Sequence, residues 1–447
     1  MPRITSGVGR ALVRLVAIAV ALGTLSGRGS LLGAQQSGTL VLGDLYRDLQ
    51  RESPKLQGAR ALVRAAEARI PSSKLPPDPQ LQLGFMNYTV PGLRPMDPLG
   101  MAQLQVMQML PVAGKLALSG RVRTAQADAQ RERASDLGWE LRSQAAMAFY
   151  ELYQTEQRLA VMRETLRLLQ DLQRTAEAMY RVGEGRQADV LRAHVEIARM
   201  TEDTLRMQTM RTAMHARLNA LLNRAADAPI ATPLLPAFPE SLPPLETLAA
   251  DAERGRPMVK AGEREVEAAD ASARFTRREI WPDITLGVQY GQRSAEMGTE
   301  RMGSLMLGAS IPVFASQRQL RMREEASAMQ VMARADLVAM RADTRGRVAE
   351  AYANLTRARN LIRLYAQTVL PQAEATVTSS LAAYRVGSVD FMTALDNRMT
   401  VNQYRQELFT LEAEEGTAWA ELEMLLGREL FEPTVTRRTA NGQGDRR

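Results

Sequence analysis

Few side chains of this chain suit catalysis or metal binding. Its 447 residues include no cysteine and only two histidines, His194 and His215. No His-Glu-x-x-His zinc motif occurs, and Gly114-Lys115 lacks the upstream glycine and the following serine or threonine of a phosphate-binding loop. The sequence therefore predicts no enzyme, no cofactor and no resident metal. The lack of cysteine also excludes disulfides, thiolate metal sites and a lipidated N-terminal cysteine.

Methionine, whose thioether is a soft metal ligand, is common in the chain, with 24 residues. Met200, Met207 and Met214 form a row spaced by seven residues. A row of thioethers could line a path for Cu(I) or Ag(I). The same spacing is typical of flexible apolar filler in a coiled-coil seam. We favour the filler interpretation, because a seam needs only apolar bulk at these positions.

The net charge of +7 does not indicate nucleic-acid binding. Residues 1–34 hold four arginines and no acid, and residues 433–447 hold four arginines and one acid, so these two ends account for the whole charge and the body is neutral. Residues 1–34 also contain an apolar run, Leu15–Leu25, followed by small residues, which predicts a cleaved secretory signal peptide. An anchor helix would need about 20 apolar residues.

The second half of the sequence repeats the first. Tyr-Arg-Val-Gly occurs at residues 180–183 and again at residues 384–387, an offset of 204. Upstream, Leu110-Pro111-Val112 matches Ile311-Pro312-Val313 at an offset of 201, and Pro77-Asp78 matches Pro282-Asp283 at an offset of 205. The chain therefore consists of two copies of one structural unit.

Each copy contains two segments with the alternation of a β-strand. Apolar side chains alternate with polar or small ones in residues 283–291 and 303–313, and residues 81–90 and 102–112 show the same pattern. Strands of about ten residues with one apolar and one polar face have the length of outer-membrane barrel strands, although a soluble hairpin would look similar.

A very long helix and a shorter return helix follow the strands of each copy. Residues 114–180 contain no proline, and their apolar positions recur every seven residues as in a coiled coil. A helix of this length extends about 100 Å, which no globular domain of this size could enclose. In the second copy Pro371 predicts a kink or break. Each long helix ends at Val-Gly, where glycine can adopt the left-handed cap conformation.

These patterns predict the following organisation: a signal peptide at 1–34; repeat 1 at 35–228, with strands at 81–90 and 102–112, a long helix at 114–180 and a return helix at 189–223; a Pro-rich linker at 229–244; repeat 2 at 245–432, with strands at 283–291 and 303–313, a long helix at 316–384 and a return helix at 391–426; and a disordered tail at 433–447.

Four strands cannot close a barrel, and open sheet edges are not tolerated in lipid, so several protomers must pool their strands. Three protomers would supply twelve strands and twelve helical rods around one axis. The predicted fold is therefore mainly α with a β-barrel portion: a trimeric α/β barrel duct built from two copies of a strand pair and a long coiled-coil helical hairpin.

This order of elements resembles the TolC-type outer-membrane efflux protein family. The resemblance covers nearly the whole mature chain and includes the run Gln108–Lys115 between strand and helix and the paired Tyr-Arg-Val-Gly ends. The Pro-x-x-Gly-Lys run also resembles, more loosely, the metal-cation branch of the family. The resemblance implies a homotrimer in the lipid of the cell outer membrane, with a helical tunnel in the periplasm. It further implies partnership with a periplasmic adaptor (membrane fusion) protein and an inner-membrane pump.

The resemblance also assigns roles to residues near the helix ends. In the family, the Val-Gly turns form the periplasmic tip that contacts the adaptor, which implies this role for Tyr180, Arg181, Val182, Gly183, Tyr384, Arg385, Val386 and Gly387. Capping of the helix and compensation of its dipole would explain the glycines and arginines without any partner. Rings of acids on the return helix close the tip in the family. Asp396 matches one such position, Thr393 replaces the acid three residues earlier, and Asp189 matches Thr393 in the first copy.

Two other functions remain open at this level. A secreted coiled-coil scaffold or adaptor would contain the same helices without a lipid-facing sheet. A duct of the same fold could instead secrete polypeptides.

Overall fold

The computed structural model describes residues 38–96, 100–295 and 298–434. The chain divides into two units, Met1–Thr39 and Leu40–Arg447, and the described helices and the larger sheet belong to the second. The predicted signal peptide, residues 1–34, lies outside the described residues, as does the predicted C-terminal tail from residue 435 onward.

The first copy begins with two helices, continues with a strand pair and ends in a helical hairpin. Its elements are α2 (Leu42–Glu52), α3 (Pro54–Ser73), β2 (Gln80–Met86), β3 (Met101–Leu110), α4 (Lys115–Arg181) and α5 (Gln187–Leu221). Helix α4 continues for 67 residues because it contains no proline and is rich in strong helix formers such as Ala, Leu, Arg and Glu.

The second copy follows the same order. Its elements are α6 (Leu245–Gly255), α7 (Pro257–Arg278), β5 (Ile284–Ala295), β6 (Gly298–Ala309), α8 (Gln319–Leu364), α9 (Leu370–Arg385) and α10 (Phe391–Leu426). Pro371 predicted a kink or break, and the structure has no break there: the chain stays helical through Pro371. The π-helical segment η1 (Tyr365–Val369) joins α8 to α9. Pro371 has no backbone N–H to donate to the preceding turn, and the i→i+5 hydrogen-bond spacing of η1 lets the helix continue in spite of this.

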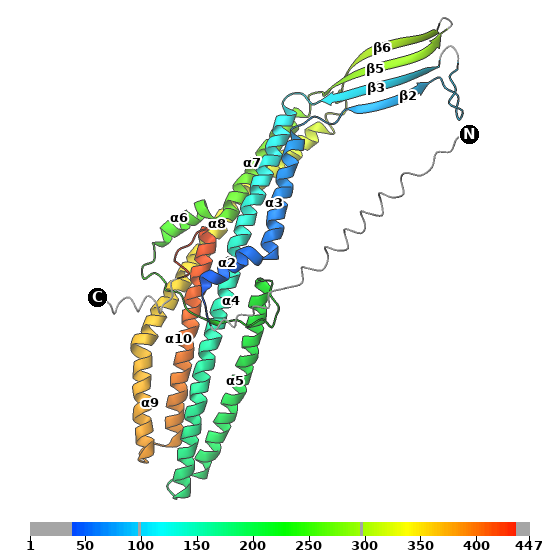
Figure 1. Ribbon diagram of the computed structural model, residues 1–447. Coiled ribbons are helices and arrows are strands. Elements are labelled where there is room, and N and C mark those ends of the chain that lie inside the picture. The colour runs from blue at the N-terminus through cyan, green and yellow to red at the C-terminus, as the bar shows by residue number, and fades with distance from the viewer. Residues whose placement is uncertain (1–37, 97–99, 296–297, 435–447) are drawn as a thin grey trace, which may run out of the picture. The chain divides into compact units, whose positions relative to one another are not determined.

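Strands β2, β3, β5 and β6 form a four-stranded antiparallel sheet in that order (Figure 1). Its central pairing joins the two copies, because β3 ends the strand pair of the first and β5 begins that of the second. Within the described residues, β2 and β6 are edge strands, each paired on one side only. In the linker, β4 (Thr232–Pro233) lies beside Leu40 of β1 (Thr39–Leu40).

Helix α4 packs against five other helices, α2, α3, α5, α7 and α10 (Figure 1). It contacts α3 and α7 along the half that is nearer the sheet, and α5 and α10 along the half that is farther from the sheet. The heptad rows of α4 are buried in these contacts, including Leu152, Leu159 and Leu169. Next to α4 and α10, the linker residue Phe238 packs against Tyr150, Trp419 and Phe431, so the linker is part of the core.

Some elements differ from the prediction. Strand β2 ends at Met86 rather than at residue 90, because Asn87 adopts a left-handed backbone conformation (φ 55°). Strand β6 covers residues 298–309 rather than 303–313, and turns follow it before α8 begins at Gln319. The helix pairs α2–α3 and α6–α7 were not predicted from the sequence. In each pair a proline, Pro54 or Pro257, begins the second helix.

A charged cluster lies inside the core where the end of α10 meets α4. The guanidinium of Arg142 stacks on the ring of Tyr46, 3.9 Å from its centroid, and lies 3.6 Å from the Glu423 carboxylate. The other carboxylate oxygen of Glu423 accepts a hydrogen bond from the amide of Leu430 at 2.8 Å. Burial raises the pKa of Glu423 to about 6, although the Leu430 amide and Arg142 both favour its charged form.

This raised pKa predicts a pH dependence of stability. Between the ordinary pKa of 4.5 and the folded value of about 6, the folded protein binds the proton of Glu423 more tightly than the unfolded chain does. Stability from this group therefore falls as pH rises through that interval, by roughly 2 kcal/mol in total. In Glu423→Gln this fall is absent, so the Tm of the variant should rise relative to wild type between pH 4.5 and 6.5.

Glu429→Gln is the matched control, because Glu429 is an exposed partner of the same arginine. Its Tm difference from wild type should stay constant over this pH interval. A constant difference for Glu423→Gln as well would contradict the role given to burial.

Candidate functional site

The sheet presents an almost continuous apolar face to its surroundings. Leu81, Val106, Val288 and Leu305 lie side by side across the four strands, and the neighbouring row contains Leu83, Leu104 and Tyr290. These side chains are exposed, to 82% in the case of Leu305. Because water disfavours a large exposed apolar patch, this face is suited to contact lipid or protein.

The opposite face of the sheet combines polar side chains with methionines such as Met107 and Met306. Gln82, Gln105, Gln289 and Ser304 form one row across it. The amide of Gln289 donates a hydrogen bond to the side-chain oxygen of Gln103 at 2.5 Å. One apolar and one polar face in strands of up to 12 residues is the arrangement of a barrel with lipid outside and water inside.

At the far end of the helices, the two Tyr-Arg-Val-Gly segments form the same turn. Gly183 and Gly387 adopt left-handed conformations, with φ of 83° and 73°, and their amides donate to the carbonyls of Tyr180 and Tyr384. A Cβ atom on either glycine would meet no other atom within 4 Å. Val182 and Val386 are 70% and 79% exposed, and Arg181 and Arg385 are also exposed. Both turns therefore present an apolar and a cationic side chain to the outside.

The two tyrosines of these segments differ. Tyr180 is exposed, whereas Tyr384 is buried and packs edge-on against Phe391 at 5.8 Å between ring centroids. Burial raises the pKa of Tyr384, and the negative charge of Asp189 raises it further. Asp189, in the first turn of α5, is thus close enough to act on the buried tyrosine of the second copy. The structure brings these two predicted site residues together.

Thr393 has a local partner, Asp390, that was not predicted from the sequence. Asp390 caps α10: it accepts a hydrogen bond from the amide of Thr393 at 3.2 Å and another from its hydroxyl, and these bonds lower the pKa of Asp390. The signal was an acid three residues before a polar side chain at a helix start. Arg186 occupies the equivalent N-terminal position of α5 without a capping side-chain hydrogen bond, and its charge also lowers the pKa of Asp390. The two hairpin turns therefore carry opposite charges at matching positions.

Asp396 lies one turn further along α10 and is exposed. It borders a hollow of about 410 Å³ between α5 and α10, which is lined mostly by polar residues of α10 and by two methionines: Met200, Met399, Thr400, Asn402, Gln403 and Gln406. No partner for the Asp396 carboxylate occurs among the residues that the structure describes. The carboxylate therefore remains available to ions in the surrounding water.

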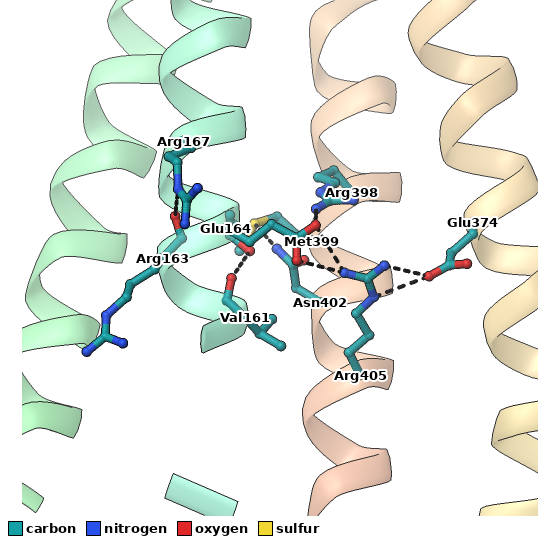
Figure 2. Close-up of polar contacts among 10 residues, drawn as sticks. Val161, Arg163, Glu164, Arg167, Glu374, Arg398, Met399, Asn402 and Arg405 are labelled. Atoms are coloured by element: carbon teal, nitrogen blue, oxygen red, sulfur yellow. Dashed lines mark hydrogen bonds and ion pairs between the residues drawn. The ribbon is translucent and has the colours of Figure 1, made fainter. Parts of the chain in front are cut away.

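Beyond this hollow, a network of four charged side chains joins three helices (Figure 2). Arg405 of α10 bonds to Glu164 of α4 at 3.1 Å and to Glu374 of α9 at 2.7 Å, and Arg398 of α10 bonds to Glu164 at 3.2 Å. Figure 2 shows Arg405 between the two carboxylates. The network links α10 to both neighbours, and it could not be predicted from the sequence because the helices are far apart along the chain.

The methionines of the row spaced by seven lie among apolar side chains. Met200 and Met207 belong to the apolar cluster near the helix tips, and Met214 packs against the central core. Across residues 38–96, 100–295 and 298–434, no group of three His, Asp or Glu side chains is placed to hold a metal ion. The packing supports the interpretation of these methionines as apolar filler.

No helix in the described part of the chain is both long enough and apolar enough to cross a membrane. A sheet with an apolar outer face, a polar inner face and open edges, joined to helical hairpins that end in matching turns, is the architecture of a protomer of an outer-membrane channel.

Comparison with known proteins gives the family. The family model described as outer membrane efflux protein matches residues 45–224 and 248–428, which are the two copies. The chain therefore belongs to the outer membrane efflux protein family. It is an efflux channel of the outer membrane, with a helical tunnel in the periplasm. Members of this family are channels rather than enzymes.

Solved structures share the fold. CusC is 18% identical, with a TM-score of 0.75 over 87% of this chain and 94% of CusC. VceC of Vibrio cholerae is 18% identical, with a TM-score of 0.74 over 87% of this chain and 97% of VceC. The open state of MtrE of Neisseria gonorrhoeae is 16% identical, with a TM-score of 0.73 over 87% of this chain and 89% of MtrE. No curated protein matches the sequence.

Proposed function

We propose that this chain is the passive duct of a tripartite efflux system. In this role a homotrimer receives substrates from an inner-membrane pump and a periplasmic adaptor and conducts them across the periplasm and the outer membrane. The observation that supports it best is the sheet, whose apolar face and two unpaired edges need both lipid and further copies of the chain.

Isolation from membranes tests this proposal. The protein should be recovered from outer membranes as a trimer whose mobility in denaturing electrophoresis changes after heating, because unheated barrels resist unfolding by detergent. Recovery of the protein with the soluble periplasm would contradict the proposal and favour a secreted scaffold.

The turns at the helix ends are the proposed contact with the adaptor. Tyr180, Arg181, Val182 and Gly183 would act together with Tyr384, Arg385, Val386 and Gly387. The exposed valines and arginines support this role, because a helix cap by itself does not need an apolar side chain that is 79% exposed.

Gly387→Trp should abolish export and leave the trimer intact. The new ring enters open space within the protomer, so the cost to the chain is only the strain of a left-handed residue, about 1–2 kcal/mol. Gly387→Asn is the control, because asparagine tolerates this conformation and adds little bulk. Accumulation of a known pump substrate in cells is the measurement; normal export by Gly387→Trp would remove the contact assignment.

The proposed periplasmic gate contains Asp396, Asp189 and Thr393. Three copies of Asp396 around one axis would form an acidic ring, which favours cations through its electric field. Thr393 would contribute by holding Asp390 at the start of α10, and Asp189 by its charge beside Tyr384.

Asp396→Asn should reduce the preference of the channel for cations. Trimers in planar bilayers, placed in a gradient of potassium chloride, would report the change as a shift of the reversal potential toward zero. Asp203→Asn removes an equally exposed acid on α5 and should leave the reversal potential unchanged. An unchanged potential for Asp396→Asn would exclude this residue from the ring.

A further inference from the structure

The sheet joins the helices at one end (Figure 1), and large apolar side chains are exposed there. They lie in the connections between α3 and β2, between α7 and β5 and between β6 and α8: Leu75, Ile280, Trp281, Ile311, Val313 and Phe314. Trp281 is 54% exposed and Phe314 is 73% exposed. Exposed apolar bulk therefore extends beyond the strands to the point where the helices begin.

The last two of these connections lie side by side. The Ser310 amide donates a hydrogen bond to the Asp283 carbonyl at 3.0 Å, and the Asp283 amide donates one to the Ser310 hydroxyl at 2.9 Å. Farther from the sheet, Gln330 and Arg334 of α8 both bond to Asp270 of α7. Helices α7 and α8 therefore run antiparallel, and the end of α7 lies beside the start of α8.

Residues 274–282 and 312–323, which make up this junction of sheet and helices, are strongly basic. They contain one acid, Glu279, and six exposed arginines: Arg274, Arg277, Arg278, Arg318, Arg321 and Arg323. Within the described residues, Arg321 is the one of the six that forms an ion pair, with Glu324 at 2.7 Å. The junction therefore combines exposed aromatic rings with guanidinium groups that have no acidic partner in the described part of the protomer.

The other end of the sheet is electrically balanced. Residues 87–100 and 292–302, which connect the strands there, contain three arginines and three acids. Arg293 pairs with Glu300 at 2.6 Å. The excess of positive charge therefore marks the end of the sheet that adjoins the periplasmic helices.

The first copy repeats the charge of the junction but not its aromatic rings. In residues 71–79 and 111–123 it keeps three exposed basic side chains: Lys74, Arg121 and Arg123. The offset of 205 carries Trp281 to Pro76, and the offset of 201 carries Phe314 to Ala113. The combination of rings and arginines therefore belongs to the second copy.

We propose that the junction binds anionic phospholipids in the periplasmic leaflet of the outer membrane. Trp281 and Phe314 lie among the headgroups and the upper acyl chains, where an interface suits aromatic rings. The arginines bind the lipid phosphates, to which one guanidinium can donate two parallel hydrogen bonds. The proposal rests on the proposed function, since it needs the sheet to lie in the outer membrane with the helices in the periplasm.

Charge complementarity distinguishes this occupant from an apolar one. An uncharged surface would cover Trp281 and Phe314 but would give the guanidinium groups no partner. A zwitterionic headgroup carries its own ammonium group, which competes with arginine for the phosphate. Each arginine near an anionic membrane surface strengthens binding about fivefold. The junction therefore prefers lipids whose phosphate charge is not balanced within the headgroup.

Fluorescence quenching by brominated lipids measures this preference at Trp281. Purified trimers are placed in vesicles of equal parts phosphatidylglycerol and phosphatidylethanolamine, with bromine on the acyl chains of one lipid or the other. The signal of Trp281 is the difference between the chain and its Trp281→Phe variant, because the other two tryptophans are common to both. Brominated phosphatidylglycerol should quench this signal more strongly, with a preference of about fivefold that falls at high salt.

Removal of three arginines should abolish the preference. In the triple variant Arg277→Gln, Arg278→Gln, Arg318→Gln, the two brominated lipids should quench equally. The control, Arg94→Gln with Arg301→Gln, removes two exposed arginines at the other end of the sheet and should keep the preference. Heat-modifiable trimers show that each variant has assembled.

Equal quenching by both lipids in the wild-type trimer, or a preference that survives in the triple variant, would overturn phosphate binding at the junction and leave the proposed function standing. Absence of a heat-modifiable wild-type trimer from outer membranes would overturn the proposed function and this binding site together. Electrophoresis of the outer membranes before reconstitution therefore separates the two failures.

Discussion

The backbone hydrogen bonds of the sheet edges are the constraint on which the rest of the molecule depends. An amide or carbonyl left unpaired in a bilayer costs several kcal/mol, and β2 and β6 each present a full row of them. One chain cannot satisfy both rows because its four strands are too few to close on themselves. The need for further protomers thus follows from the strand number.

The two copies share a fold but carry different charged side chains at matching positions. Lys115 forms an ion pair with Asp283 where the sheet meets the helices, whereas the aligned position of the second copy is Ser316. At the opposite end, Arg186 and Asp390 occupy matching helix starts with opposite charges. A duplicated chain can give one copy a bond or a charge that the other lacks. A duct made from six identical units could not distinguish seams within protomers from seams between them.

The spacing of apolar residues along the sequence predicted the long helices and the two faces of the strands, because each depends on residues close together in the chain. The seven-residue spacing of Met162, Leu169 and Ala176 predicted α4, and all three are buried. Alternation predicted the faces of the strands, but not the end of β2, which depends on the left-handed conformation of Asn87. The Val-Gly turns lie at both tips as expected. The network of Glu164, Arg405 and Glu374 could not be predicted, because it requires knowing which helices are neighbours.

Near the helix tips, apolar packing contributes more to stability than the ion pairs do. Glu164 and Glu374 are about half exposed, so each ion pair with Arg405 contributes at most about 1 kcal/mol. Burying a leucine or a methionine contributes about 1.5–3 kcal/mol, and the tip cluster buries several such side chains from α4, α5 and α10. The apolar cluster therefore holds the hairpins together, and the arginines select the alignment of α10 between α4 and α9. Since the ion pairs are weak individually, a displacement of α10 past its neighbours would be opposed mainly by the apolar contacts it exposes.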